Sequence, residues 1–450
     1  MAFLKNSYSN IWRITYPIIL GSLAQNFVYI ADTAFLGRVS EVALGAAAIG
    51  GLFYVAIFML GMGLGTGTQI IIARRKGENN TDGIGNIVDH SFYLLITFSI
   101  LLFLLIYIFS PALLQPAIAS DGVYQASMEY LDYRVYGIFF AFINVVFRAF
   151  YVGIGDTKVL IWSTASMALV NIVLDYCLIF GHWGFPTMGI GGAALASVIS
   201  EVFTTGYFLL HISRKKRNTG QSFVEDYQLF QFLRPAWKTF QTIFKVGLPV
   251  MFQTFISVSS WFVFYLIIEQ EGERPLAISN IIRSIYLVLM IPAFGFYSAT
   301  HTLVSNAMGA KLVDEVWPTL KKIILLATAF TLVLIQVNIF FPLEVIGVYT
   351  DNAELALAVV PTLEVITIAL LILPATFILF GAVAGTGNTT ASLIIEVVTI
   401  IIYLAFTYEV AIERHWPIHE IWYAEFVYLT CLGGFSWIYL KLGRWKKTKI

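Results

Sequence analysis

Long apolar segments, separated by short polar ones, follow one another along nearly the whole chain. A transmembrane helix needs about 20 mostly apolar residues, and about twelve segments reach that length. The strands of a membrane barrel would be about ten residues long, with alternating apolar and polar positions. The pattern therefore predicts an all-α integral membrane protein. We expect its helices near residues 11–37, 46–73, 90–112, 129–152, 159–181, 189–212, 243–268, 276–304, 320–348, 355–384, 392–412 and 420–442.

The two halves of the chain repeat one another at a constant step of 232 residues. Residue pairs that keep this step include Pro17 and Pro249, Tyr54 and Tyr286, Gly63 and Gly295, Gly77 and Gly309, and Gly153 and Gly385. Six helices per half return the chain to its starting side, so the halves are parallel repeats about an axis along the membrane normal. We predict lobes at 1–212 and 241–450, joined by an amphipathic linker at 213–240.

Composition and charge agree with this interpretation. Hydrophobic residues make up 58% of the chain and charged residues 12%, against roughly 25% charged residues in soluble proteins. Basic residues gather in alternate loops, as expected on the cytoplasmic side; they include Arg74, Arg75, Lys76, Lys158, Arg214, Lys215, Lys311, Lys321, Lys441 and Arg444. Both termini are therefore predicted to be cytoplasmic. We interpret the basic run Arg214–Arg217, at the start of the linker, as an orientation signal, and expect no nucleic-acid partner.

Several functions are disfavoured by what the motifs lack. Cys177 and Cys431 lie in predicted membrane helices, which supports neither a disulfide framework nor a cysteine metal site. The chain has no G-x-x-x-x-G-K phosphate loop, so ATP-driven transport is not expected. The glycine-rich stretch 61–67 suits close helix packing. His419-Glu420 lacks the second histidine of a zinc-protease motif, so we do not expect an enzyme.

The most informative residues are polar side chains inside the predicted membrane helices. They are Asp32, Asn171, Asp175, Glu201, Arg283 and Glu396. An ionisable group at bilayer depth costs at least ~2.5 kcal/mol and marks a functional site by default. Asn171 and Asp175 are four residues apart and share one helix face. The residues 232 positions after Asp32, Asn171 and Asp175 are Phe264, Tyr403 and Thr407, so only the N-terminal half carries this chemistry.

Two carboxylates that converge in a partly dry cavity resist double ionisation, so such a site readily takes up a proton. A sodium ion held by Asp32, Asp175 and the Asn171 carbonyl is the alternative. Either event removes charge and can bias a two-state helix arrangement. A purely structural alternative places Asp32 in solvent or at a helix break. Glu201 and Glu396 are secondary candidates for a functional site. The alternative is that each faces a cavity or hydrogen-bonds to a neighbouring helix. Arg283 is a candidate partner for one of them.

Several segments in this order resemble one known family. They are Pro17–Gln25, Ala31–Arg38, Gly153–Lys158, Asn171–Tyr176, Gly189–Ser197 and Gly247–Gln253. Together they resemble the multidrug and toxic compound extrusion (MATE) transporters, in particular the DinF-like branch, over essentially the whole chain. The resemblance implies a V-shaped fold of two lobes, which acts as a monomer in the plasma (inner) membrane.

The resemblance also implies a function. Family members are antiporters that export bulky, often cationic organic compounds against inward proton or sodium flow, without a cofactor. Asp32, Asn171 and Asp175 match the N-lobe cation site, and Tyr130 and Ser197 match further members of it, although threonine is usual at the last position. Pro17 matches a proline at which the first helix bends when the aspartates are protonated, and proline makes a bend there inexpensive.

One departure from the family bears on the mechanism. The NorM-like branch places acidic residues in the C-lobe, on the seventh and tenth helices. In this chain the seventh helix has Gln253 and no acid before Glu269, and the tenth has only Glu364. The pattern favours coupling in the N-lobe and leaves proton and sodium as alternatives.

The predicted substrate path is the cleft between the lobes, lined by Gln25, Tyr29, Gln253 and Trp261. Tyr29 and Trp261 occupy equivalent repeat positions, and their rings suit flat organic cations. The alternative is that both rings pack against neighbouring helices.

Two other functions stay open. A lipid-linked precursor flippase of the same superfamily would need a strongly basic cavity, and we find only Arg148 and Arg283 in the middle of predicted helices. A receptor or scaffold would gain nothing from a buried pair of acids.

Overall fold

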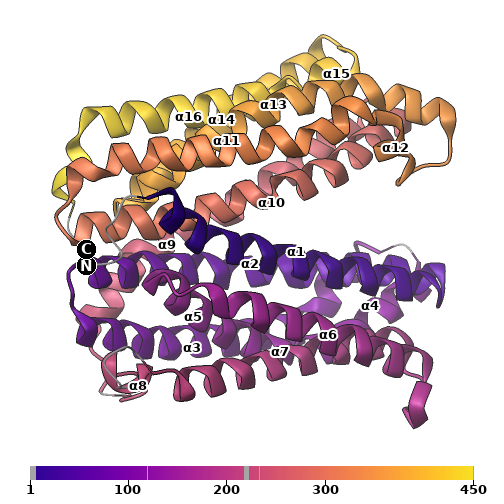
Figure 1. Cartoon of the computed structure of the whole chain (residues 1–450). Helices are drawn as coiled ribbons and strands as arrows, with labels where there is room; N and C mark the ends of the chain where they lie inside the picture. The colour runs from indigo at the N-terminus through magenta and orange to yellow at the C-terminus, as the bar shows by residue number, and fades with distance from the viewer. Residues whose placement is uncertain (1–6, 119, 217–221, 233, 449) are drawn as a thin grey trace. The chain divides into compact units, whose positions relative to one another are not determined.

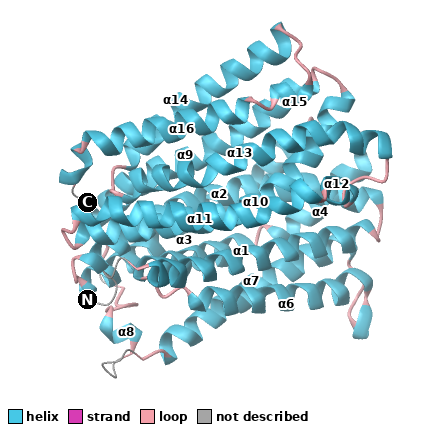
Figure 2. Ribbon diagram, turned by 45° about the horizontal axis from the view of Figure 1, so that its top comes forward, coloured by secondary structure: helices cyan, strands magenta, loops and turns pink. Residues whose placement is uncertain are grey.

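The computed structural model describes residues 7–118, 120–216, 222–232, 234–448 and 450. This part of the chain is helical throughout and has no β-strand (Figure 2). The helices of the first half are α1 (Tyr8–Gly37), α2 (Glu41–Gly77), α3 (Thr81–Leu114), α4 (Asp121–Arg134), α5 (Gly137–Ile154), α6 (Lys158–Phe180), α7 (Gly189–Arg214) and α8 (Phe223–Asp226). Those of the second half are α9 (Trp237–Glu269), α10 (Glu273–Gly309), α11 (Val316–Phe340), α12 (Pro342–Gly347), α13 (Ala353–Gly385), α14 (Thr389–Tyr408), α15 (Ile418–Ile421) and α16 (Ala424–Leu442).

Among the described residues, 11 helices are long and apolar enough to cross a membrane, which confirms a multi-pass membrane protein. The twelfth predicted span, 420–442, corresponds to α15 and α16, but α16 is not one of these eleven helices. Its 19 residues include Glu425 and Lys441. The predicted span 129–152 is also divided, because α4 ends at Arg134 and α5 begins at Gly137.

The chain folds into two compact units. We call Tyr16–Met251 the N unit, and Phe252–Ile450 together with Met1–Thr15 the C unit. Helices α1 and α9 therefore each contribute to both units, and they divide beside Pro17 and Pro249, the two prolines that share a repeat position. The predicted linker 213–240 lies within the N unit, and residues 217–221 and 233 of it are outside the described residues.

Close helix packing in the N unit depends on the glycine-rich stretch of α2. A Cβ on Gly63 would lie 2.4 Å from the Cα of Met251, and one on Gly67 would lie 2.4 Å from the Cα of Gly247. A Cβ on Gly61 would meet the ring of Phe142 at 2.4 Å. These approaches confirm that the stretch serves helix packing. In the same unit α2 also packs against α3, α4 and α5, and α6 against α7 (Figure 1).

Helix α13 lies at the centre of the C unit. It packs against α10, α11, α14 and α16. Its side chains Ile366, Ala369, Leu370 and Leu373 are fully buried, each with 0% of its surface exposed. The helix is apolar on all sides, which suits an environment in which its faces meet other helices or lipid.

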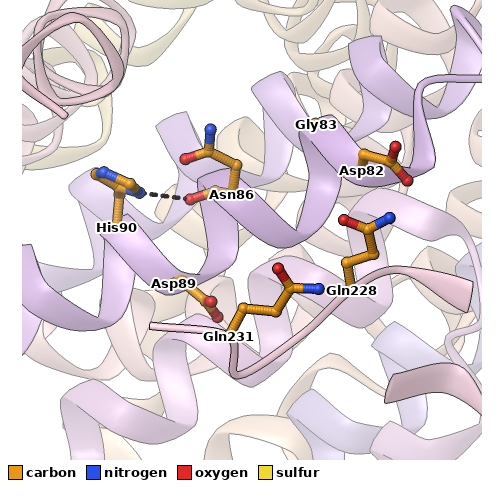
Figure 3. Close-up of a pocket in the computed structure, with 7 residues that line it drawn as sticks. All are labelled: Asp82, Gly83, Asn86, Asp89, His90, Gln228 and Gln231. Carbon is orange, nitrogen blue, oxygen red and sulfur yellow. Dashed lines mark hydrogen bonds between the residues drawn. The ribbon is translucent and has the colours of Figure 1, made fainter. Parts of the chain in front are cut away.

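The segment after α8 is tied to α3 by two consecutive side chains. Asp89 accepts hydrogen bonds from the backbone N–H groups of Phe230 and Phe232, each at 2.9 Å. His90 Nε2 accepts the N–H of Ala236 at 2.8 Å, while its Nδ1 lies 2.8 Å from the Asn86 carbonyl oxygen. A polar cavity of about 250 Å³ lies beside this attachment, as Figure 3 shows. The linker is therefore a docked part of the N unit.

Candidate functional site

The structure brings the three residues of the predicted cation site together in the N unit. Asp32 lies on α1, and Asn171 and Asp175 lie one turn apart on α6. The hydrogen bonds assign the Asn171 amide so that its nitrogen faces both acids. In that orientation it donates to Asp32 Oδ1 at 3.0 Å and to Asp175 Oδ2 at 3.3 Å. The spacing of four residues on α6 has thus placed one amide against two carboxyl groups.

The two carboxyl groups also lie within hydrogen-bonding reach of each other. A carboxylate only accepts hydrogen bonds, so this contact needs a proton on one of the two acids. Asn171 and Asp175 are fully buried, and Asp32 is half-buried. Within the described part of the chain, no donor group reaches Asp175 Oδ1. Since an uncompensated buried carboxylate is costly, the geometry suits a pair that carries one bound proton.

Ser197 completes the side of the site that α7 contributes. Its Oγ lies 3.5 Å from the terminal amide atom of Asn171 that faces away from the acids. Helices α6 and α7 form a hairpin whose turn begins at Gly181, in the left-handed region at φ 73°. A Cβ on Gly181 would lie 2.2 Å from Thr187 Oγ1, so glycine fits both the backbone conformation and the space. The hairpin sets Ser197 opposite Asn171.

Beside the aspartates lies an ion pair that the sequence analysis did not identify. Arg134 binds Glu201 with both terminal nitrogens, at 2.7 and 3.0 Å. Its guanidinium lies 3.9 Å from the centre of the Tyr54 ring, and Tyr130 hydrogen-bonds to it. The positive charge of Arg134 also acts on Asp32.

These contacts correct the expectation that Arg283 pairs with Glu201. The partner of Glu201 is Arg134, and Arg283 instead lies with its guanidinium 4.9 Å from the centre of the Tyr265 ring. Arg134 belongs to the fourth predicted span, but the sequence analysis did not count it among the arginines of the membrane helices. Its position four residues after Tyr130 places both on one helix face, which was a usable signal. The break between α4 and α5 accommodates the pair, because a Cβ on Gly137 would lie 2.3 Å from Arg134 and 2.5 Å from Glu201.

The equivalent location in the C unit is filled by aromatic rings. Phe264 and Tyr403, the counterparts of Asp32 and Asn171, are stacked with their ring centres 5.9 Å apart. Trp422 packs edge-on against Phe264, with a centre-to-centre distance of 5.2 Å. Both units therefore use this location, one for a polar cluster and the other for apolar packing.

The remaining buried acid, Glu396, lies on α14 in the C unit. It accepts hydrogen bonds from Ser257 on α9 and, at 3.0 Å, from Tyr428 on α16. Hydroxyl groups therefore surround this acid, and the expected arginine partner does not. No sequence pattern signals this pairing, because the three residues lie on three separate helices.

The four predicted substrate residues differ in their surroundings. Gln25 is exposed, and Tyr29 has 70% of its surface exposed. Gln253 is buried and donates to the Tyr297 hydroxyl at 3.4 Å. The Trp261 ring is stacked on that of Tyr286, with 6.1 Å between their centres. Trp261 thus shows the packing that the alternative reading expected, and the substrate role of all four stays a prediction.

Comparison with known proteins identifies the family. The MatE family model matches residues 17–177 and 249–408, two copies whose starts keep the step found within the sequence. A probable multidrug resistance protein NorM of Thermotoga maritima is 27% identical over 392 residues, which cover 86% of this chain and 82% of that protein.

Solved structures show the same fold. A MOP superfamily transporter from Pyrococcus furiosus superposes with a TM-score of 0.88 at 21% identity, and covers 98% of this chain and 97% of that one. A MATE structure described as the bent conformation superposes with a TM-score of 0.86 at 21% identity, and covers 97% and 96%. These likenesses confirm the predicted architecture of two six-helix repeats. Because the family model matches well over half of its residues, the chain belongs to the MatE family of MATE transporters.

Proposed function

We propose that the chain is a secondary active multidrug exporter that couples efflux of organic, often cationic compounds to inward proton movement through Asp32 and Asp175. The choice of ion rests on the orientation assigned to one amide from its hydrogen bonds. In that orientation the Asn171 N–H group faces both acids, which lie within hydrogen-bonding reach of each other. A sodium ion would need the amide oxygen on that side, since alkali and alkaline-earth cations take oxygen ligands. The arrangement supports a proton shared by the pair.

Binding and release of the proton change the charge of the aspartate pair. With one proton bound, the pair carries a single negative charge near Arg134, whose own charge is matched by Glu201. Gain or loss of a proton alters the hydrogen bonds between α1 and α6. Pro17 lies inside α1 beside the point where that helix passes from one unit to the other. Because proline cannot donate to the helix ladder, we place the bend of an alternating-access cycle there.

The substrate class is inferred from relatives and from surface chemistry. Curated relatives carry the name multidrug resistance protein. Tyr29 presents an exposed ring of the kind that binds flat organic cations. We place the chain in the plasma (inner) membrane as a monomer with both termini on the cytoplasmic side, as the distribution of its basic residues indicates. Assignment to the DinF-like branch belongs to this proposal.

Reconstituted transport tests the proposal. Purified protein in liposomes should move a fluorescent cationic dye when a proton gradient is imposed, and Asp32→Asn should abolish that movement. Asp314→Asn is the matched control, because the Asp314 side chain is 99% exposed. Unchanged dye movement in Asp32→Asn would contradict coupling at this site. Dye movement driven only by a sodium gradient would show that the coupling ion is sodium and not the proton. Lipid scrambling without dye movement would favour the flippase.

A further inference from the structure

Glu396 is a buried acid in the C unit that the proposed function does not use. Its side chain has 1% of its surface exposed. Both of its hydrogen bonds, from Ser257 and Tyr428, go to Oε1. Oε2 is buried, and no partner for it occurs among the described residues. One oxygen of this carboxyl group is therefore paired twice and the other is unpaired.

The titratable groups around Glu396 are other acids and phenols. Tyr428 on α16 contacts it directly, and Tyr297 on α10 lies within electrostatic range. Beyond Tyr428 lies Glu425 of the same helix, which accepts a hydrogen bond from Tyr286 at 2.6 Å.

Two basic side chains of the C unit contact aromatic rings. His301 packs edge-on against Tyr297, with 4.3 Å between the ring centres, and Arg283 lies over Tyr265. In the described part of the chain, Glu396 and Glu425 form no ion pair with a lysine, arginine or histidine. The charge of an ionised Glu396 is therefore uncompensated.

The donor set identifies the ligand. A sodium ion would need several oxygen ligands, but the Glu396 oxygen that faces other groups is already occupied by two hydroxyl donors. A proton needs only the unpaired Oε2. When it binds, the carboxylate becomes a neutral acid, which removes the uncompensated buried charge. We propose that Glu396, held by Ser257 and Tyr428, is a second proton-binding site, located in the C unit.

This site is separate from the aspartate pair. The residues 232 positions before Ser257, Glu396 and Tyr428 are Gln25, Thr164 and Ala196, so the N unit has no equivalent. The site also contacts a helix to which both units contribute. Ser257 lies on α9, the helix that both units share, and its hydroxyl holds the carboxyl group whose charge changes. Proton binding at Glu396 thus acts on α9, as the aspartate pair acts on α1.

Infrared titration tests this site without measuring transport. Spectra of the purified full-length protein in lipid nanodiscs, recorded from acid to alkaline pH, separate carboxylic acids from carboxylates. The wild type should show an acid C=O band that disappears as the pH rises, and Glu396→Gln should lack that band. Glu425→Gln, a change of another buried acid, should retain it, as should Asp32→Asn. Asp32→Asn should lose dye transport but keep the Glu396 band, so this proposal and the proposed function can fail independently.

A second variant keeps the acid in place. Tyr428→Phe removes a donor that stabilises the carboxylate, so the band should persist to a pH about one to two units higher. The proposal is overturned if Glu396→Gln shows the same acid bands as the wild type at every pH, because Glu396 would then stay ionised throughout. It is equally overturned if the band never disappears, because the acid would then be permanently neutral. An unchanged titration in Tyr428→Phe would contradict the site geometry even if Glu396→Gln failed to fold.

Discussion

The ion pair between Arg134 and Glu201 offers a sharp test of how the N unit tolerates charge. Its side chains are only 12% and 13% exposed. Arg134→Gln keeps a polar side chain of similar reach but removes the positive charge. Glu201 then stays buried without a cation, and Tyr54 loses the guanidinium that its ring faces. We expect a large loss of stability.

The magnitude follows from the burial of the pair. Removing one member of a buried ion pair costs about 3–5 kcal/mol, because the remaining charge is uncompensated. The double variant Arg134→Gln/Glu201→Gln leaves two neutral amides that can hydrogen-bond to each other. Its loss should be nearer the ~1 kcal/mol of an ordinary hydrogen bond. The double variant should therefore be more stable than the single one by about 2 kcal/mol or more.

SDS titration of protein in mixed micelles measures the free energy of unfolding of the wild type, the single variant and the double variant. Arg274→Gln is the control, because Arg274 and its partner Glu354 are 58% and 76% exposed. Exposed pairs of this kind contribute about 0–1 kcal/mol. The reasoning fails if Arg134→Gln costs no more than Arg274→Gln. It also fails if the double variant is as unstable as Arg134→Gln.

Two further predictions concern docking and packing in the N unit. Asp89→Ala removes the acceptor of two linker N–H groups. Each bond to a charged group contributes about 1.5–3 kcal/mol. Amide hydrogen exchange of residues 227–232 should therefore accelerate about tenfold or more. Asp82→Ala is the control, and equal exchange in both variants would refute the attachment. Gly67→Ala should destabilise the protein by about 1–3 kcal/mol through overpacking against Gly247. Gly51→Ala, where nothing lies within 4 Å of the new Cβ, should be neutral or stabilising; similar losses in both would contradict the close approach.

The sequence was sufficient for the repeat and for the acids, for physical reasons. Apolar length reports membrane helices directly, and a constant step between Pro17 and Pro249 reports duplication without any structure. The spacing of Asn171 and Asp175 fixes their common helix face. The position of Asp32 opposite them followed from the family resemblance, since no local pattern links α1 to α6.

Other parts of the site could not be obtained in this way. The pairing of Arg134 with Glu201 depends on the break between α4 and α5, and a continuous apolar pattern conceals that break. The shell of Glu396 joins residues from α9, α14 and α16, whose contacts depend on tertiary packing. The orientation of the Asn171 amide is assigned from the hydrogen-bond network, which depends on tertiary packing and has no signal in the sequence.

The shared tyrosines show how one scaffold came to hold opposite charges. Tyr54 and Tyr286 occupy the same repeat position and are both buried. The ring face of Tyr54 lies against the Arg134 guanidinium, whereas the hydroxyl of Tyr286 donates to the Glu425 carboxyl. A phenol can serve either charge, because its ring face is negative and its O–H is a donor. A charged neighbour can therefore change sign without a change in the tyrosine. The two units of the duplicated scaffold accordingly carry their buried acids at different places.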